Sequence, residues 1–401
     1  MPVNTDRVIV VGAGPVGCTV AAMFIERGIP VLLLEAEAQL PRQLRASTFH
    51  PPTLELYDRF GIVDEMKTDG LVAPAIQYRD RQQGLVAEFD LGTLGNDTTH
   101  PYRIQVEQWR VCEYLLNRLE ASDLFEVRWD AAVRTVQEVD SAVAVTLTSG
   151  EEIHGSWVVG ADGAHSAVRK ALEIEFEGWT YEDRYLVVST PFELKDHIPD
   201  LALINYVADP DEWLVLLRTK PLWRILFPIA EPETDRLALS PESVQRRLHG
   251  VVDNGNDFVI GHTTMYNVHQ RVAETFRVGR VLLAGDAAHI NSPLGGMGLN
   301  NGVHDAWLLG DMLGSVIDET RPPDALDTYA SIRRDIAVDY VQRTTHHNAV
   351  TLSSRDAATR YQALDDLKVK AQTPEGQREY LLQASMINAV NHMRTTVGGL
   401  S

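Results

Sequence analysis

The sequence predicts an α/β fold into which a mainly antiparallel β domain is inserted, followed by C-terminal helices. Three observations carry this prediction. The chain opens with an apolar strand-like run, a glycine-rich turn and a helix-compatible segment, the order of a parallel β-α-β unit. Strand-like runs, some with period-two alternation, then dominate residues 126–159 and 185–270. Beyond Pro322 and Pro323 the apolar residues recur at helical spacing.

Length and composition indicate a globular protein with a large core. The 401 residues favour two to three domains. With 44% hydrophobic and 23% charged residues, the chain is neither disordered nor fibrous. The formal net charge of −20 disfavours nucleic acid and anionic membranes as partners. Two cysteines without a CxxC pair, Cys18 and Cys112, are typical of a reduced, cytoplasmic protein.

One uncharged segment, residues 8–25, resembles a signal peptide or a short membrane span. It contains three glycines and Pro15, which would break an apolar helix near its centre. A strand, a tight turn and a helix explain the same residues better, so we expect neither targeting nor membrane insertion.

The expected elements follow from these patterns. Strands are predicted at 7–11 and 31–34, with a helix at 16–27 between them and Gly28 as its C-cap. A further buried strand is predicted at 278–284, followed by a glycine-rich loop and a helix at 300–317. In the β domain strands are predicted at 201–208, 213–219, 222–229 and 258–268, and a Pro-, Glu- and Asp-rich connection at 231–243 lies between the last two.

The first motif is GAGPVG, which follows a strand and opens a helix. In a dinucleotide fold, Gly12 allows the tight turn, Gly14 lets the backbone approach a pyrophosphate, and Gly17 allows close helix packing. The free N–H groups of the helix would bind phosphate. Glu35, at the end of the next strand, would accept hydrogen bonds from ribose hydroxyls. This arrangement predicts a Rossmann-like domain, the alternative being a purely structural turn, and does not separate FAD from NAD.

The second motif is VVGADGAHSAVR, in which a strand ends at Asp162 and Gly163. Taken alone, it is an acidic N-cap at a strand–helix turn. In the third motif, Asp286 follows a buried strand, where its carboxylate can bind sugar hydroxyls. Further glycines of this loop permit the backbone to approach a flat ring, and the following helix points its positive end toward that ring. These glycines are Gly295, Gly296 and Gly298.

The three motifs, in this order and at this spacing, resemble the FAD-dependent aromatic hydroxylases of the para-hydroxybenzoate hydroxylase type. The resemblance spans residues 5–345. It implies a Rossmann-like FAD-binding domain in three pieces, an inserted β domain that binds substrate, and a helical tail. The expected bounds are 1–73, 100–180 and 270–345 for the first, 74–99 and 181–269 for the second, and 346–401 for the third.

The resemblance also implies which residues hold FAD. Gln105 competes with Gln108 for the role near the ribityl chain, and Asp162 would serve both FAD and the nicotinamide cofactor. Met297 departs from the family, since many relatives carry Gln there. The ADP half would contact Gly12, Gly14, Pro15, Val16, Gly17, Glu35 and Ala36, and the rest of FAD would contact Arg45, Gln108, Asp162, Gly285, Asp286, Pro293, Gly296, Gly298, Leu299 and Asn300.

The implied reaction is hydroxylation of an electron-rich phenol or heteroaromatic ring. NADH or NADPH would reduce FAD, and O2 would form a flavin C4a-hydroperoxide that donates oxygen. The sequence predicts no metal site and no covalent nucleophile. The expected partners are a small aromatic substrate, O2 and NAD(P)H, and the acidic C-terminal helices point to a homodimer.

Substrate contacts are expected from the β domain and the flavin side. Arg218 and Arg224 lie on apolar strands and could bind a substrate carboxylate, or they could be solvent-facing or ion-paired. Tyr206 is a further candidate, and Pro293 would line the reaction pocket. His50 could be a base or proton relay, or a structural histidine.

Three alternatives remain open at this point. A two-component flavin oxygenase would use FADH2 made elsewhere. A flavin-dependent halogenase shares the fold, but its WxWxIP run is only partly matched by WRILFP at 223–228. A non-catalytic FAD-binding protein would keep the cofactor and lose turnover.

Overall fold

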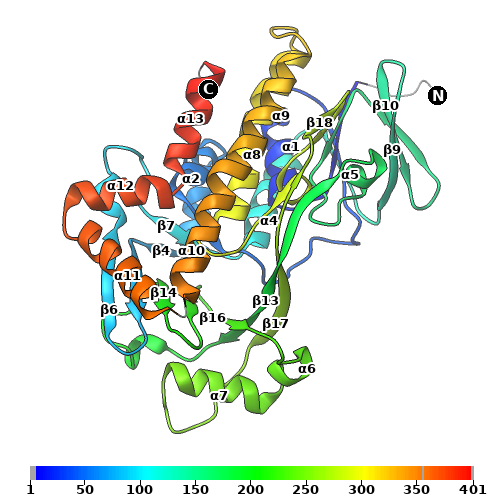
Figure 1. Cartoon of the computed structure of the whole chain (residues 1–401). Coiled ribbons are helices and arrows are strands. Elements are labelled where there is room, and N and C mark those ends of the chain that lie inside the picture. The colour runs from blue at the N-terminus through cyan, green and yellow to red at the C-terminus, as the bar shows by residue number, and fades with distance from the viewer. Residues whose placement is uncertain (1–5, 355, 399–401) are drawn as a thin grey trace.

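The computed structural model describes residues 6–354 and 356–398. Figure 1 shows two sheet regions joined by long strands, with helices packed around them. The first region is a six-stranded, mainly parallel sheet with the strand order β18-β19-β12-β1-β2-β8. Its strands are β1 (Val8–Val11), β2 (Val31–Leu34), β8 (Phe125–Arg128), β12 (Trp157–Gly160), β18 (Arg277–Val278) and β19 (Val281–Leu283).

The central strands of this sheet are apolar throughout because both of their faces are buried. Helix α1 (Pro15–Glu26) packs between α8 (Met297–Ile317) and α4 (Gln108–Leu119). An antiparallel sheet of β9 (Val133–Val139), β10 (Ala142–Leu147) and β11 (Glu152–Gly155) lies beside α5 (Ala167–Ala171).

The second region is an eight-stranded sheet with the order β20-β17-β13-β16-β15-β14-β5-β6. All its neighbours pair antiparallel except β14 and β5. The segment of β5 and β6 joins this sheet although it lies far earlier in the chain. The strands are β5 (Ala75–Asp80), β6 (Gly84–Asp90), β13 (Phe176–Thr190), β14 (Ile204–Ala208), β15 (Leu214–Arg218), β16 (Trp223–Ile229), β17 (His262–Ala273) and β20 (His289–Ile290).

Strands β13 and β17 connect the two regions (Figure 1). They pair from Phe176 with Ala273 at one end to Ser189 with His262 at the other, with a register shift between Thr180 and Arg184. A small third sheet, β3-β7-β4, lies at the junction. Its strands are β3 (Thr48–Phe49), β4 (Leu71–Ala73) and β7 (Arg103–Gln105).

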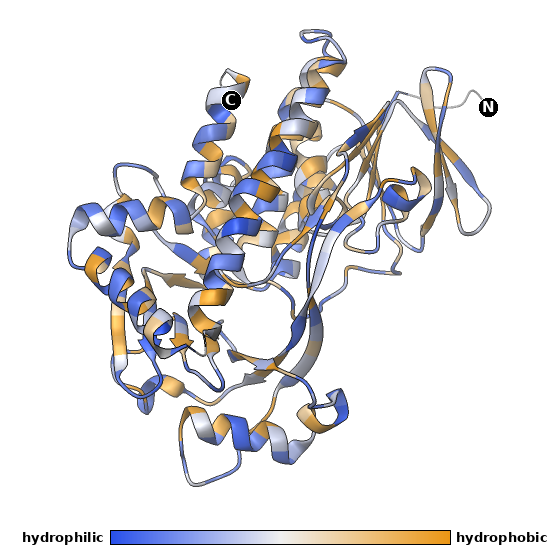
Figure 2. Ribbon diagram, in the orientation of Figure 1, coloured by the Kyte–Doolittle hydropathy of each residue, from blue (hydrophilic) through white to orange (hydrophobic). Residues whose placement is uncertain are grey.

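The remaining helices cover the sheets. Figure 2 shows that the C-terminal helices alternate polar and apolar residues, whereas the parallel strands are mainly apolar. Helices α11 and α12 pack against β6, and α13 packs against α2. The helices are α2 (Pro51–Arg59), α3 (Val63–Asp69), α6 (Asp235–Ala238), α7 (Pro241–Val251), α9 (Ala325–Asp335), α10 (Arg343–Ser353), α11 (Ala357–Ala371), α12 (Pro374–Ala384) and α13 (Ile387–Val397), with 3-10 turns at Leu91–Leu94, Leu194–Asp196 and Gly285–Ala287 and a π-helical turn at Ile336–Gln342.

The predicted fold class is confirmed, with an α/β core, an inserted antiparallel sheet and a helical C-terminus. The connection at 231–243 differs from expectation because it contains α6 and the start of α7. Ser240 caps α7 through its Oγ, which accepts from the Ser243 amide, and Pro241 occupies the first turn. The domain bounds stay a prediction. Among the described helices, none has both the length and the apolar character needed to cross a membrane.

Gly17, in the first turn of α1, leaves no room for a side chain. A Cβ there would lie 1.9 Å from the carbonyl oxygen of Gly12, whereas a Cβ at Gly14 would have nothing within 4 Å. We expect Gly17→Ala to lower the free energy of unfolding of the apoprotein by about 1–3 kcal/mol, since backbone must move. Urea unfolding measures this, with Gly14→Ala as the matched control. Equal stability of the two variants would contradict the packing argument.

Candidate functional site

Two adjoining cavities lie where the parallel sheet meets the eight-stranded sheet. The first, called here the turn cavity, has a volume of about 530 Å³ and is lined by the β1–α1 turn. The second, called here the sheet cavity, has a volume of about 940 Å³ and is lined by the strands of the eight-stranded sheet. The two cavities share a wall, because six residues line both of them: Gln43, Arg45, Ala46, Asp286, Gly298 and Leu299.

The turn cavity presents a helix N-terminus with free backbone donors. Gly14 is the N-cap of α1 and provides no side-chain cap. Gly12 adopts a φ of 102°, and a Cβ there would lie 2.5 Å from the Ala161 carbonyl oxygen, so the turn depends on glycine. Glu35 is fixed beside the turn, because its Oε2 accepts from the Ala13 amide at 2.7 Å. An anionic group fits this end of the cavity.

Asp162 lies at the carboxyl end of β12 and lines the turn cavity. The N-cap of α5 is Ser166, not Asp162 as the sequence predicted, since Ser166 Oγ accepts from the Arg169 amide. Asp162 adds to this cap, because its Oδ2 accepts from the amides of Ala167 at 2.6 Å and Val168 at 3.2 Å. Its Oδ1 is buried and has no hydrogen-bond partner. Together with the open space at Gly14, this unpaired oxygen fits a ligand that carries hydroxyl or N–H donors, as a dinucleotide does.

The loop that ends in α8 lines both cavities. Gly295 and Gly296 adopt φ values of 107° and 67°, which favour glycine, and Gly296 is the N-cap of α8. Asn300 holds the loop in place: its Nδ2 donates to the carbonyls of Gly296 at 2.7 Å and Thr48 at 2.9 Å. Its Oδ1 accepts from the amide of His50 at 2.9 Å. Met297 is buried at the start of this helix.

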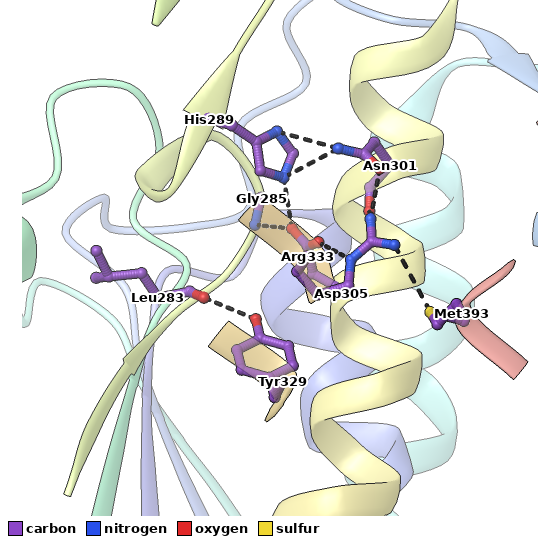
Figure 3. Close-up of polar contacts among 8 residues, drawn as sticks. All are labelled: Leu283, Gly285, His289, Asn301, Asp305, Tyr329, Arg333 and Met393. Atoms are coloured by element: carbon purple, nitrogen blue, oxygen red, sulfur yellow. Dashed lines mark hydrogen bonds and ion pairs between the residues drawn. The ribbon is translucent and has the colours of Figure 1, made fainter. Parts of the chain in front are cut away.

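A buried ionic cluster holds the Asp286 loop (Figure 3). Asp305 of α8 accepts from the Gly285 amide at 2.8 Å and the His289 Nε2 at 2.6 Å through Oδ2. Its Oδ1 accepts from Arg333 Nε at 2.5 Å. Burial alone would raise the pKa of Asp305, but the charges of His289 and Arg333 lower it to about 2. The cluster fixes the backbone on both sides of Asp286, whose own pKa is raised by burial.

The sheet cavity is mainly apolar, with a few polar groups. The hydroxyl of Tyr206 interacts with Arg103 and with the amide of Gly295. Burial raises the pKa of Tyr206, against the opposing effect of these contacts, so the phenol stays protonated near neutral pH. The apolar walls of the sheet cavity come from Val187, Ile204, Val215, Leu217 and Leu226.

Of the residues expected to act on substrate, Tyr206, Arg224 and Pro293 line the sheet cavity. The guanidinium of Arg224 donates to the carbonyls of Leu44 at 3.3 Å and of Arg45, and lies 3.8 Å from Glu107. Arg224 therefore fixes the backbone of the 44–47 segment at the junction of the cavities.

Arg218 and His50 lie outside both cavities. Arg218 forms an ion pair with Glu193 at 3.1 Å and donates to the Thr219 carbonyl at 2.7 Å. Of the roles left open by the sequence, the structure therefore shows an ion-paired arginine. His50 is fully buried behind Gly296, and neither ring nitrogen has a hydrogen-bond partner. Burial and the charge of Arg103 hold the pKa of His50 well below its usual range.

Most residues expected to hold the cofactor meet at the cavities. Three of them lie behind the cavity walls and do not line either cavity: Gly17, Gly285 and Asn300. Gln105 does not line a cavity either, and its Oε1 accepts a hydrogen bond of 2.9 Å from Thr48 Oγ1. Those that line a cavity are Gly12, Gly14, Pro15, Val16, Glu35, Ala36, Arg45, Gln108, Asp162, Asp286, Pro293, Gly296, Gly298 and Leu299.

Sequence reasoning missed Arg103, which lines the sheet cavity from β7. It is 1% exposed. The short run around it, RIQVEQ, has the composition of an exposed strand edge, so only the tertiary packing of α12 over β7 reveals its burial.

Comparisons with known proteins agree with this geometry. The family described as FAD binding domain matches residues 5–344. The para-nitrophenol 4-monooxygenase of Pseudomonas sp. (strain WBC-3) is 32% identical over 394 residues, with 96% of each chain covered. The 6-hydroxy-3-succinoylpyridine 3-monooxygenase HspB of Pseudomonas putida (strain DSM 28022 / S16) is 31% identical, covering 86% of this chain and 88% of that one. The crystal structure of p-nitrophenol 4-monooxygenase PnpA from Pseudomonas putida DLL-E4 superposes with a TM-score of 0.90 at 29% identity, over 96% of this chain and 98% of that one.

The ionic cluster predicts a pH dependence of stability. The folded pKa of Asp305, about 2, is lower than the ordinary value of about 3.9. Its stabilising contribution is therefore complete above pH about 4 and is lost as the pH falls toward 2. We expect Asp305→Asn to cost about 3–5 kcal/mol near neutral pH, because the fully buried Arg333 loses its counter-charge.

Urea unfolding between about pH 5 and pH 3 tests this expectation, since the variant should lose less stability on acidification than the parent. Asp318→Asn is the control, because Asp318 is partly exposed in its ion pair with Arg27. Parallel pH curves for the parent and Asp305→Asn would contradict the argument.

Proposed function

Since this chain belongs to the FAD-binding domain family, and its whole-chain relatives are aromatic monooxygenases, it is an FAD-dependent aromatic monooxygenase, and we propose that it hydroxylates a single-ring phenol or hydroxypyridine. The resemblance that the three motifs predicted is confirmed. NAD(P)H and O2 are its co-substrates. Within this class, the substrate and the residue roles given below are proposals.

The observation that carries the proposal is the shared wall of the two cavities. Asp286, Gly298 and Leu299 line both of them. A cofactor that extends from the α1 N-terminus toward α8 would therefore end at the mouth of the sheet cavity. A substrate ring in the sheet cavity would then meet the reactive end of the cofactor directly.

We propose that the residues of the turn cavity hold the ADP half of FAD. Gly14 and the α1 N-terminus would receive the pyrophosphate, and Glu35 and the free Oδ1 of Asp162 would accept from cofactor donors. The backbone at Gly298 and Leu299 would face the flavin ring. When bound, FAD supplies the redox and oxygen chemistry, while the chain positions the substrate and excludes water.

The sheet cavity has room for an aromatic ring with a polar substituent. Aliphatic side chains of the strands keep water from the reacting centre. Tyr206, protonated near neutral pH, can donate to a substrate oxygen. The relatives named above act on a nitrophenol and a hydroxypyridine, which both carry an oxygen substituent on an aromatic ring.

We also propose a cytoplasmic location, supported by the two free, buried cysteines, Cys18 and Cys112. The homodimer expected from the C-terminal helices stays a prediction. Light scattering on the purified protein distinguishes a dimer from a monomer.

The activity test is oxidation of NADH or NADPH by FAD-loaded protein in air, without added reductase, across phenols and hydroxypyridines. We expect at least about a tenfold stimulation by one member, with a hydroxylated product. No stimulation by any member, with product formed only from supplied FADH2, would contradict a single-component enzyme. Loss of both reactions would favour a non-catalytic FAD-binding protein.

The role of Gly14 in cofactor binding gives a separate prediction. A methyl group at Gly14 meets no protein atom within 4 Å, so it occupies space left for the ligand. We expect Gly14→Ala to fold normally but to weaken FAD binding at least about tenfold, or 1.4 kcal/mol. Titration of apoprotein with FAD measures the affinity. Unchanged FAD affinity would place the pyrophosphate elsewhere.

A further inference from the structure

Arg103 is a buried cation that faces the sheet cavity without a counter-ion. It is 1% exposed and lies on β7, beneath the end of α12. Its Nη2 donates to the Ala384 carbonyl at 2.7 Å, and its Nε is buried without a partner. Among the residues that the structure describes, no carboxylate lies within ion-pair distance of this guanidinium.

An uncompensated buried charge is expensive, and proteins normally pair it or neutralise it. Arginine stays protonated in proteins, so deprotonation does not relieve Arg103. Carbonyl oxygens and the Tyr206 hydroxyl supply dipoles, but they supply no negative charge. The missing counter-charge is therefore expected from a ligand in the cavity that Arg103 lines.

Of the three other arginines that line this cavity, Arg42 and Arg224 each lie beside a carboxylate, and Arg45 is the third. Arg42 forms an ion pair with Glu113 at 2.9 Å, and Arg224 lies beside Glu107 and binds carbonyls of the 44–47 segment. Arg45 lies at the junction of the cavities, where its charge acts on Asp286, the only carboxylate among the described lining residues. The cavity is thus cationic inside a chain of net charge −20.

We propose that Arg103 binds a negatively charged oxygen of the aromatic substrate, a phenolate or a carboxylate, and so makes the enzyme select anionic rings over neutral ones. The planar guanidinium can form charge-assisted hydrogen bonds with such an oxygen. Tyr206, which contacts Arg103, donates to the same oxygen or to its neighbour. This inference rests on the proposed function, and it assigns the recognition of substrate charge to Arg103 in place of Arg218 and Arg224.

The test measures ligand binding to oxidised, FAD-loaded enzyme without NAD(P)H, by flavin absorbance or calorimetry. The probes are 4-nitrophenol and 4-hydroxybenzoate, each with a neutral partner, 4-nitroanisole and methyl 4-hydroxybenzoate. We expect the parent enzyme to prefer an anionic probe by roughly ten- to a hundredfold, the range for a hydrogen bond to a charged group. Arg103→Met should abolish the preference, and Arg103→Lys should retain part of it.

The two probe pairs separate the two sources of charge. Preference for 4-nitrophenol that grows as the pH rises through its phenol pKa identifies a phenolate. Preference for 4-hydroxybenzoate over its methyl ester, with no such rise, identifies a carboxylate. Arg218→Met is the matched control, because Arg218 lies outside the cavity in its ion pair with Glu193, and it should keep the parent preference.

Full preference in Arg103→Met would overturn the inference. If that variant fails to retain FAD, Arg103→Lys and Arg103→Gln give the same comparison, and equal preference in these two would also overturn it. A parent enzyme that binds and turns over neutral and anionic rings alike would overturn the inference alone. A parent enzyme that binds none of the probes and shows no substrate-stimulated NAD(P)H oxidation would refute the proposed function as well.

Discussion

The carboxylate of Asp305 is the constraint on which the site depends. It lies inside α8 with no exposed surface, and it joins the loop after β19 to α9 through Gly285, His289 and Arg333. An interior of low polarity strengthens each of these contacts, so together they stabilise the observed arrangement of the loop. Asp286 and the glycines of the α8 N-terminus are thereby held at fixed positions relative to the β1–α1 turn.

The second constraint is the pair of long strands. The two strands are antiparallel: β13 begins and β17 ends near the parallel sheet. Their ladder, with its register shift between Thr180 and Arg184, runs on into the eight-stranded sheet and so links the two regions that carry the cavities. The contribution of the C-terminal helices is different. Their packing against β6 and over β7 buries Arg103, and their carbonyl at Ala384 orients its guanidinium.

The sequence predicted best those features that depend on local geometry. Gly12 and Gly17 could be assigned because the tight turn excludes a Cβ at each position. Asp162 could be assigned because an acid at a strand–helix junction accepts from the first amides of the helix, although Ser166 is the N-cap itself. Charged residues on strands were harder. Arg218 and Arg103 have similar sequence surroundings, and their tertiary neighbours determine which of them is free to bind a ligand. Glu193 forms an ion pair with Arg218, whereas α12 covers Arg103. The helix at 241–251 was missed because the acidic, proline-containing approach to it has the composition of a loop, although Ser240 and Pro241 form a helix start.

The buried apolar residues of the described chain form three separate clusters. The buried residues around the parallel sheet form one cluster, and those of the eight-stranded sheet form two others on its opposite faces. Replacements at Val187, Val215 or Leu226 therefore alter the lining of the sheet cavity without repacking the cofactor-side core. Effects at such separated sites add nearly independently. Substitutions in the strands of the eight-stranded sheet can therefore change which aromatic rings are accepted during evolution. The residues around the parallel sheet, on the cofactor side, can meanwhile stay unchanged under separate selection.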